Sequence, residues 1–312
     1  MSGRIRVNDQ VLIVYVALQH LLHGRSKLDL AEELGVSRFK VGRMINQARD
    51  LGLVEVVPKL SVPIDVELSR NLKQRFGLEE ALVAVAATSS ELHTREAIAG
   101  VAAAYLSDNV AEDSVLGFGP GRTIIEVCDR IVGLPVCDVV QLTGVATRDE
   151  EQSLQAIYSL SRVSKGKMFS LHAPFLATTE LAAQAIVSQP SVNQALSRID
   201  RVEMAVLTIG GWPDSSLLAE MLRQLGELDE LLEKGAVAEI GTTVLNRDGR
   251  VISDIDSRTI GISLEQLQRI PYRIVLGGGE GKHEAMIATL NSGLVEMVVT
   301  DAHSALAALE NA

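Results

Sequence analysis

Cysteine is scarce in this 312-residue sequence, and Cys128 and Cys137 are too far apart for a CxxC metal or redox pair. Two cysteines also give no disulfide framework, so we expect a reducing compartment. No apolar run approaches the ~18 residues that a membrane helix needs. The apolar stretch Val11–Leu18 follows Arg4 and Arg6, but no small-residue cleavage site of a signal peptide comes after it. We therefore expect a cytoplasmic protein with no membrane partner.

Positive charge is also in short supply, with 29 Lys and Arg against 40 Asp and Glu and a net charge of −11. Taken alone, this charge disfavours a partner made of phosphate. The deficit is uneven, however, because residues 1–57 carry eight basic and six acidic residues, a net of +2, and residues 58–312 carry −13. Any contact with nucleic acid is therefore predicted in residues 1–57.

What the sequence does have, in its first sixty residues, is the pattern of three short helices. Val11–Leu22 is nearly all apolar and predicts a buried helix that ends at Gly24, and Leu28–Leu34 predicts a short second helix. Ser37 is a good N-cap for a third helix. In that helix the apolar residues recur at i, i+3, i+4 and i+7, the buried stripe of an amphipathic helix: Val41, Met44, Ile45 and Ala48.

The spacing of Ala31, Gly35 and Val41 is the spacing that a helix-turn-helix needs. A small residue at Ala31 lets two helices approach, Gly35 allows the tight turn, and Val41 fills the angle between them. The alternative is a three-helix cap with a solvated basic face.

The face of the third helix opposite Val41 has the composition of a DNA-reading surface. Phe39 suits a thymine methyl group, and Arg38 or Arg43 suits guanine. Gly42 costs ~1 kcal/mol relative to Ala inside a helix, which is explained if the backbone approaches a duplex there. Lys40 and Arg49 would contact phosphates. The predicted DNA-binding residues are Ser37, Arg38, Phe39, Lys40, Gly42, Arg43, Asn46 and Arg49.

After a strand predicted at Val54–Val57 and a hinge predicted at Pro58–Pro63, short apolar runs alternate with helical segments. The runs are Ala81–Ala86, Val115–Phe118, Val139–Thr143, Met168–Leu171, Val202–Ile209, Tyr272–Leu276 and Leu294–Thr300. The helices are Val66–Phe76, Thr94–Ser107, Thr123–Arg130, Glu150–Ser164, Glu280–Ser292 and Ala302–Glu310. This alternation predicts a Rossmann-like α/β domain with a mainly parallel sheet over residues 58–312, after an all-α helix-turn-helix domain over residues 1–57.

Two glycine-rich loops follow predicted strands and precede predicted helices, at the edge of a parallel sheet where ligands bind. In the first, Gly119, Gly121, Arg122 and Thr123 can form a phosphate cradle at a helix N-terminus, or simply a tight turn. The third glycine of a dinucleotide fingerprint is missing.

In the second loop, Gly278, Gly279 and Lys282 offer a glycine nest and a cation for a phosphate or a sugar hydroxyl. The alternative is an exposed lysine without a partner. Leu276 replaces the first glycine of a P-loop and His283 its Ser or Thr, which excludes nucleotide hydrolysis.

Polar residues after two other predicted strands, Gln141 with Gly144 and then His172, are predicted to face the same crevice. The six histidines lack the spacing of a metal site, and no Ser/His/Asp or Cys/His set can be assembled. We therefore expect no catalytic residues, no metal and no cofactor.

Four stretches make the chain similar to the SorC-type bacterial transcription regulators, which include central-glycolysis, sorbitol and deoxyribonucleoside regulators. They are LDLAEELGVSRFKVGRMINQARDLGLVEV, LGFGPGRT, LHAPF and LGGGEGKHEAMIATL. The resemblance implies a DNA-binding domain followed by an effector domain similar to sugar-phosphate isomerases but without catalysis. It also implies a phosphorylated sugar between loops like Gly119–Thr123 and Gly278–Lys282, and a homo-oligomer, commonly a tetramer.

The chain departs from the family pattern in two places. The family often has a Gly-Asp pair whose aspartate touches effector hydroxyls, and Gly241-Thr242 lacks that carboxylate. Pro120 removes one amide donor from the first loop.

The sequence therefore predicts a regulator that binds double-stranded operator DNA as a homotetramer or homodimer and responds to a sugar phosphate. An unphosphorylated sugar or polyol as effector is the alternative. A sugar-phosphate isomerase with an accessory N-terminal domain is a further alternative.

Overall fold

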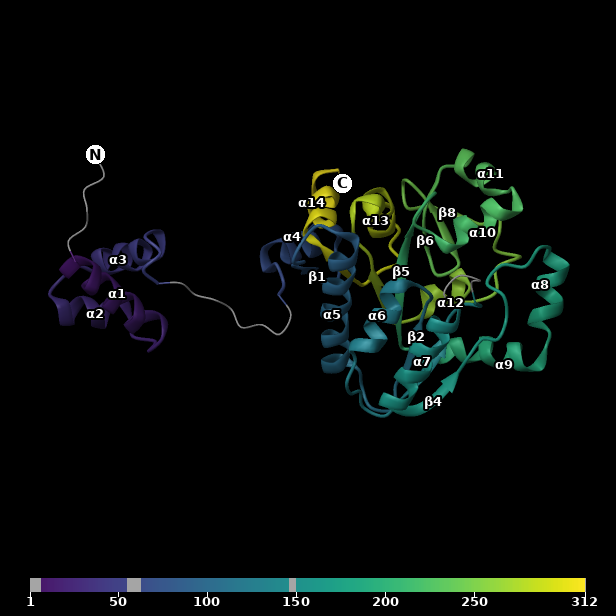
Figure 1. Ribbon diagram of the computed structural model, residues 1–312, viewed down its shortest axis with the longest axis horizontal. Helices are drawn as coiled ribbons and strands as arrows, with labels where there is room; N and C mark the ends of the chain where they lie inside the picture. Colours follow the sequence, from purple (N-terminus) through teal and green to yellow (C-terminus); the bar gives the residue numbers. More distant parts are fainter. Residues whose placement is uncertain (1–6, 55–62, 146–149, 312) are drawn as a thin grey trace. The chain divides into compact units, whose positions relative to one another are not determined.

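A computed structural model of the protein describes residues 7–54, 63–145 and 150–311 (Figure 1). The chain divides into two compact units, Met1–Ser61 and Val62–Ala312, each with its own apolar core. Residues 55–57 of the predicted strand and residues 58–62 of the predicted hinge lie outside the described residues.

The N-terminal unit consists of three helices, α1 (Val7–Leu21), α2 (Lys27–Leu34) and α3 (Arg38–Asp50). Gly35 ends α2 in the left-handed conformation with a φ of 61°. Ser37 caps α3 by accepting a hydrogen bond from the Lys40 amide at 3.2 Å. Val41 is fully buried between the helices, and Ala31 is buried beside it. The three helices, the tight turn and the buried plug are therefore confirmed.

Helix α1 is buried on one face only, so the prediction of a buried helix is correct for that face and wrong for the other. Ile13 and Val16 enter the core, while Val11 is 64% exposed. A three-helix unit of this size encloses a single small core, which has room for one stripe of each helix.

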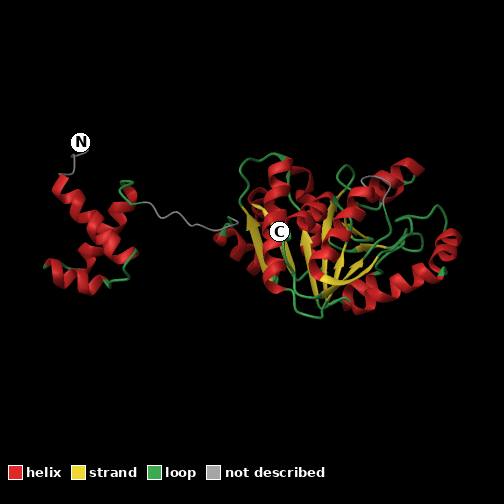
Figure 2. Cartoon of the chain, turned by 60° about the horizontal axis from the view of Figure 1, so that its bottom comes forward, coloured by secondary structure: helices red, strands yellow, loops and turns green. Residues whose placement is uncertain are grey.

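The second unit is a sheet covered by helices on both faces (Figure 2). Its strands are β1 (Glu80–Ala84), β2 (Val115–Phe118), β3 (Cys137–Gln141), β4 (Lys165–Phe169), β5 (Met204–Gly211), β6 (Ala236–Ile240), β7 (Thr243–Asn246), β8 (Val251–Ile252), β9 (Tyr272–Leu276) and β10 (Met297–Asp301). Its α-helices are α4 (Val66–Phe76), α5 (Glu91–Asn109), α6 (Arg122–Arg130), α7 (Glu150–Ser164), α8 (Glu180–Val187), α9 (Pro190–Arg198), α10 (Leu217–Leu225), α11 (Leu228–Glu233), α12 (Leu264–Arg269), α13 (His283–Asn291) and α14 (Ala302–Glu310). Two 3-10 turns, η1 (Ile199–Arg201) and η2 (Glu280–Lys282), complete it.

Alternate residues of the central strands enter two separate cores. On β5, Val206 packs with α5, α6 and α7, while Ala205 and Leu207 pack with the cluster that includes α4, α13 and α14. This burial on both faces explains the continuous apolar runs seen in the sequence. The predicted α/β class is confirmed.

Seven strands form a parallel sheet in the order β1-β10-β9-β5-β2-β3-β4. From β2 the chain builds outward through β3 and β4, and then it returns to β5 and builds the other way through β9. The strand order therefore reverses between β2 and β5, and ligands bind at the carboxyl ends of strands at such a point.

The last three residues of β5, Ile209 to Gly211, leave the parallel sheet and pair antiparallel with β6. Strands β6, β7 and β8 continue as an antiparallel meander. These three strands and helices α8 to α12 are missing from the elements that the sequence predicted. The single predicted helix Glu280–Ser292 is a 3-10 turn followed by α13, and the break falls at Lys282, whose φ of −125° and ψ of 7° are not helical.

Candidate functional site

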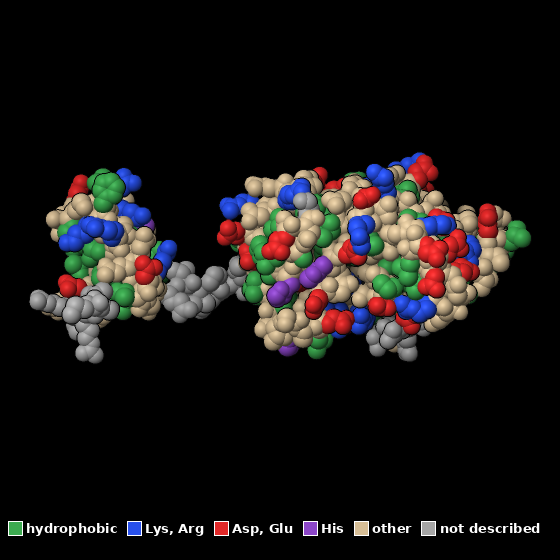
Figure 3. All heavy atoms as spheres, turned by 90° about the horizontal axis from the view of Figure 1, so that it is seen from above, with side chains coloured by type: hydrophobic (Ala, Val, Ile, Leu, Met, Phe, Trp, Pro, Cys, Tyr) green, Lys and Arg blue, Asp and Glu red, His purple; other side chains and the backbone are tan. Residues whose placement is uncertain are grey.

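The first candidate surface is the outer face of α3. Phe39 is 85% exposed, and no side chain of the described unit covers it. The predicted residues Arg38, Lys40, Arg43, Asn46 and Arg49 are exposed on the same helix, with Ser37 as its cap. Lys and Arg side chains are prominent on the N-terminal unit in Figure 3.

Gly42 on this helix has open space around it. Apart from its chain neighbours and the backbone of its own helix, a Cβ at this position would have no heavy atom within 4 Å, so packing inside the unit does not require glycine. A requirement for glycine at this position would have to come from outside the unit.

The second candidate site lies where the strand order reverses, at the carboxyl end of β5. The loop after β2 and the loop after β9 stand on either side of β5, because β5 pairs with both strands. The topology thus brings together the two glycine-rich loops that the sequence singled out, although about 160 residues separate them along the chain.

The loop after β2 is held against β5. Gly119 donates its amide to the Val206 carbonyl oxygen at 2.9 Å, and the Thr208 hydroxyl donates to the Pro120 carbonyl oxygen at 2.9 Å. Gly121 has a φ of 129°, and a Cβ there would lie 2.9 Å from the Thr208 hydroxyl oxygen. Helix α6 then begins at Arg122.

The start of α6 offers hydrogen-bond donors. Among the described residues, the amides of Arg122 and Thr123 have no hydrogen-bond partner. Free first-turn amides and the positive end of the helix dipole favour an anion. The Arg122 guanidinium pairs with Glu91 at 2.9 Å, and its side chain is 59% exposed.

The loop after β9 is fixed by an aspartate. Gly279 donates its amide to Asp301 Oδ2 at 2.8 Å, and Asp301 also caps α14. A Cβ at Gly278 would collide with the same carboxylate, which leaves room only for glycine. Lys282, at the end of η2, points toward β5 and donates from Nζ to the Ile209 carbonyl oxygen at 2.7 Å. Burial lowers the pKa of Lys282, and the nearby Glu239 carboxylate opposes this shift.

Glu239 is a site residue that the sequence did not predict. It lies on β6 with 7% exposure, against Gly210 of β5, and accepts a hydrogen bond from the Trp212 indole. Burial raises the pKa of Glu239 to about 7, and its hydrogen bonds from Ser216 and Trp212 limit the shift.

Thr242 stands where the family pattern has a carboxylate, and Glu239, three residues earlier, brings a buried carboxylate to this segment. The Thr242 hydroxyl donates instead to the Ile262 carbonyl oxygen in the interior. Trp212 follows two glycines at the end of β5. Only the pairing of β6 with β5 brings Glu239 to it.

Gln141 and Gly144 lie at the end of β3, and both make backbone contacts. The Gln141 amide donates to the Thr143 carbonyl oxygen at 2.9 Å and accepts from the Leu171 amide at 3.3 Å. Gly144 donates to the Ile260 carbonyl oxygen at 2.7 Å and packs against the backbone of Pro174. Both residues thus hold the ends of β3 and β4 together.

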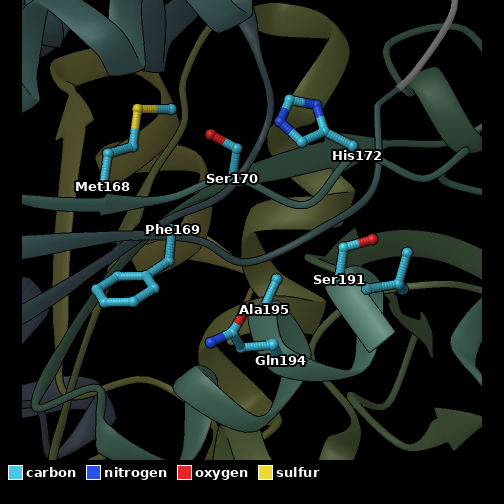
Figure 4. Close-up of a pocket in the computed structure, with 8 residues that line it drawn as sticks. Met168, Phe169, Ser170, His172, Ser191, Gln194 and Ala195 are labelled. Carbon is cyan, nitrogen blue, oxygen red and sulfur yellow. The ribbon is translucent and has the colours of Figure 1, made fainter. Parts of the chain in front are cut away.

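His172 lies farther out, beyond the end of β4. Strands β3 and β2 separate β4 from β5, which places the β4 end about 14 Å from the β5 end. His172 lines a pocket of about 220 Å³ between this segment and α9 (Figure 4). The other lining residues are Met168, Phe169, Ser170, Ser191, Val192, Gln194 and Ala195. The structure therefore places His172 at a pocket of its own.

Two further observations concern residues 7–54, 63–145 and 150–311. Within these ranges no group of three or more His, Cys, Asp or Glu is placed to hold a metal ion. No helix in this part of the chain is both long and apolar enough to cross a membrane.

Comparisons with known proteins agree with this architecture. A family model described as “Putative sugar-binding domain” matches residues 62–310. The transcriptional regulator YjhU of Escherichia coli (strain K12), whose own role is uncharacterized, is 24% identical over 301 residues, covering 93% of this chain and 91% of the relative. The transcriptional regulator LsrR of Enterobacter sp. (strain 638) is 26% identical over 322 residues, covering 98% and 94%. The crystal structure of the full-length sorbitol operon regulator SorC from Klebsiella pneumoniae shares the fold, with a TM-score of 0.70 and 22% identity over 97% of this chain and 99% of that one.

We expect the Glu239→Gln variant to gain stability relative to the wild-type protein as pH rises from about 5 to about 7. Between the ordinary glutamate pKa of 4.5 and the folded value of about 7, the folded protein keeps a proton that the unfolded chain has lost. The free energy of unfolding of the wild-type protein therefore falls across this pH window and levels off above it. The variant lacks this contribution, because glutamine does not titrate. Urea unfolding midpoints of both proteins measured across this pH range check the prediction, and parallel curves would contradict it.

Proposed function

The chain belongs to the SorC-type family that carries this sugar-binding domain, and from this premise we propose that it is a DNA-binding transcription regulator whose operator affinity is controlled by a phosphorylated sugar. Residues 1–57 form the DNA-binding domain in this proposal, and residues 58–312 bind the effector and mediate oligomerisation. The named relatives support the first part, since YjhU and LsrR are called transcriptional regulators.

The DNA-binding half rests on the exposed face of α3. An aromatic ring that is 85% exposed between two basic residues costs solvation unless a partner covers it. A major groove suits this face, because thymine methyl groups accept apolar contact and guanine accepts a bidentate arginine. Arg43 is the residue we assign to guanine, and Lys40 and Arg49 to phosphates.

The observation that carries the effector half is the partly buried Lys282 ammonium, which reaches from the second glycine-rich loop to the end of β5 at the strand reversal. A partly buried cation favours an anionic ligand, and the free first-turn amides of α6 lie at the same carboxyl end of the strands. Arg122 and Thr123 add a guanidinium and a hydroxyl. These groups together suit the phosphate of an effector.

The sugar part of the effector is assigned to the carboxylate side of the site. Glu239 beside Trp212 offers an acceptor for hydroxyl groups and an apolar ring edge. Gln141 and Gly144 shape the wall formed by β3, and His172 would contribute only to a ligand that extends toward β4.

Oligomerisation is part of the proposal because residues 1–57 of one copy have a net charge of only +2. The phosphate contribution to DNA affinity grows with the number of basic contacts. Two or four copies, as a homodimer or homotetramer, would multiply those contacts on operator half-sites. Effector binding then changes operator affinity through the packing of subunits.

We expect Gly42→Ala to weaken operator binding without harming the fold. The added methyl group meets no atom of the unit, and alanine favours a helix interior by ~1 kcal/mol relative to glycine. On DNA the methyl group would obstruct the close approach of the helix backbone. Gel-shift titration and thermal unfolding of the two proteins measure both effects.

Arg43→Ala is the positive control for this experiment, with an expected loss of ~1–3 kcal/mol in specific binding. Unchanged operator affinity in both variants would place the reading surface elsewhere. No operator binding by the wild-type protein even at low salt would contradict the regulator itself.

We expect a phosphorylated sugar to stabilise the protein more than its free counterpart, and Lys282→Gln to remove most of this difference. A charge-assisted hydrogen bond to phosphate contributes ~1.5–3 kcal/mol, which corresponds to roughly 10- to 100-fold in affinity. Thermal shifts with paired free and phosphorylated sugars measure it. Lys167→Gln, an exposed lysine on β4, is the matched control.

Equal stabilisation by free and phosphorylated sugars would favour the alternative of an unphosphorylated sugar or polyol effector. A phosphate preference that survives in Lys282→Gln would place the phosphate away from the loop after β9.

A further inference from the structure

The Arg122 guanidinium, a candidate phosphate ligand, already has an anionic partner. Its Nη2 lies 2.9 Å from Glu91 Oε1, and the same oxygen accepts a hydrogen bond from Arg95 Nη1 at 3.2 Å. Glu91 is the first residue of α5, and Arg122 is the first residue of α6. One carboxylate therefore links the beginnings of two helices that pack side by side (Figure 1).

Three other hydrogen-bond donors around the end of β5 also have acceptors inside the protein. Lys282 donates to the Ile209 carbonyl oxygen, the Thr208 hydroxyl to that of Pro120, and the Gly279 amide to Asp301. A ligand that uses any of these donors has to displace the acceptor.

Two of the acceptors named above, Asp301 and Glu91, are charged carboxylates, and they differ in how firmly the protein holds them. Asp301 is 4% exposed and also accepts hydrogen bonds from the His303 and Ser304 amides and the Ser304 hydroxyl, so it is fixed. The Glu91 side chain is 69% exposed, and within the described part of the chain it is bonded only to the two arginines named above. Glu91 is therefore the charged acceptor that can leave without breaking a buried network.

We propose that Glu91 is an internal competitor for the anion site: its carboxylate holds Arg122 when the site is empty, and the anionic group of the ligand replaces it. This inference rests on the proposed function, because it takes the anion site at the start of α6 as given. Glu91 thereby sets the affinity for anionic ligands without affecting neutral ones.

The exchange is energetically feasible because the two partners of Arg122 are unequal. An ion pair between exposed side chains is weak and is screened by salt. A phosphate group accepts two parallel hydrogen bonds from a guanidinium and carries more charge. Replacement also breaks the link between α5 and α6, so the arrival of an anion is transmitted to the contact between these helices.

The test is the affinity of the full-length protein for inorganic phosphate, measured by calorimetry at low salt. We expect Glu91→Gln to bind phosphate about 3- to 10-fold more tightly than the wild-type protein, since the competitor and its repulsion are both removed. The gain should shrink at high salt. Glu112→Gln removes an equal charge from an exposed turn before β2, at the amino end of the strand and away from the candidate site. It should leave the affinity for phosphate unchanged.

A double-mutant cycle distinguishes competition for Arg122 from a general electrostatic effect of Glu91 on phosphate binding. In an Arg122→Gln background, Glu91→Gln should give a clearly smaller gain, because the pair that it breaks is already absent and only the repulsion between Glu91 and phosphate is relieved. A gain of undiminished size there would overturn the inference, as would equal affinities of wild type and Glu91→Gln. In both cases phosphate still binds, so the proposed effector class stands.

The opposite outcome is equally informative. If neither protein binds phosphate or any sugar phosphate, the anion site itself is absent and the phosphorylated effector falls together with this inference. Thermal unfolding of each variant checks that it is folded. Glu91 and Arg122 are both exposed side chains, so folding is expected to be retained.

Discussion

Strand β5 is the element on which the site in the second unit depends. It is hydrogen-bonded to β2 on one side and to β9 on the other, and its last residues turn away to pair with β6. Two loops and a meander from distant parts of the chain therefore meet at one strand end. The loops lie close to β5, since Gly121 packs on Thr208 and Lys282 bonds to the Ile209 carbonyl oxygen. A displacement of β5 would separate all three components at once.

The burial of charge at this strand end has a physical cost, and the structure partly offsets it. Burial disfavours both the charged form of Lys282 and the charged form of Glu239, and each group favours the charged form of the other. The Trp212 indole donates to Glu239, which satisfies one of its oxygens. Buried ionisable groups that are only partly compensated are typical of ligand sites, because an arriving ligand supplies the missing partners. A purely structural role would be served better by apolar residues of similar size.

Much of this arrangement could be predicted from the sequence, and the part that could not has a clear cause. The helix-turn-helix spacing and helix α4 depend on local rules, capping and periodicity, which act within a few residues. The two glycine-rich loops were found because each directly follows an apolar strand. Glu239 was missed because its position depends on the antiparallel pairing of β6 with β5, a contact between residues about 30 apart. A short strand with an acidic residue inside it resembles a solvated surface segment until its partner is known.

The net negative charge of the chain does not by itself determine which ligands the two parts of the chain can bind. Residues 58–312 carry the net charge of −13, yet their candidate ligand site contains Lys282, Arg122 and Arg95 in place of a general excess of carboxylates. Specific pairs such as Glu91 with Arg122 therefore matter more to an anionic ligand than the total charge, which is screened beyond about 10 Å in salt. The same reasoning applies to residues 1–57, where a net charge of +2 hides a concentration of basic side chains on α3. Local arrangement, and not total charge, therefore determines which partners each unit can bind.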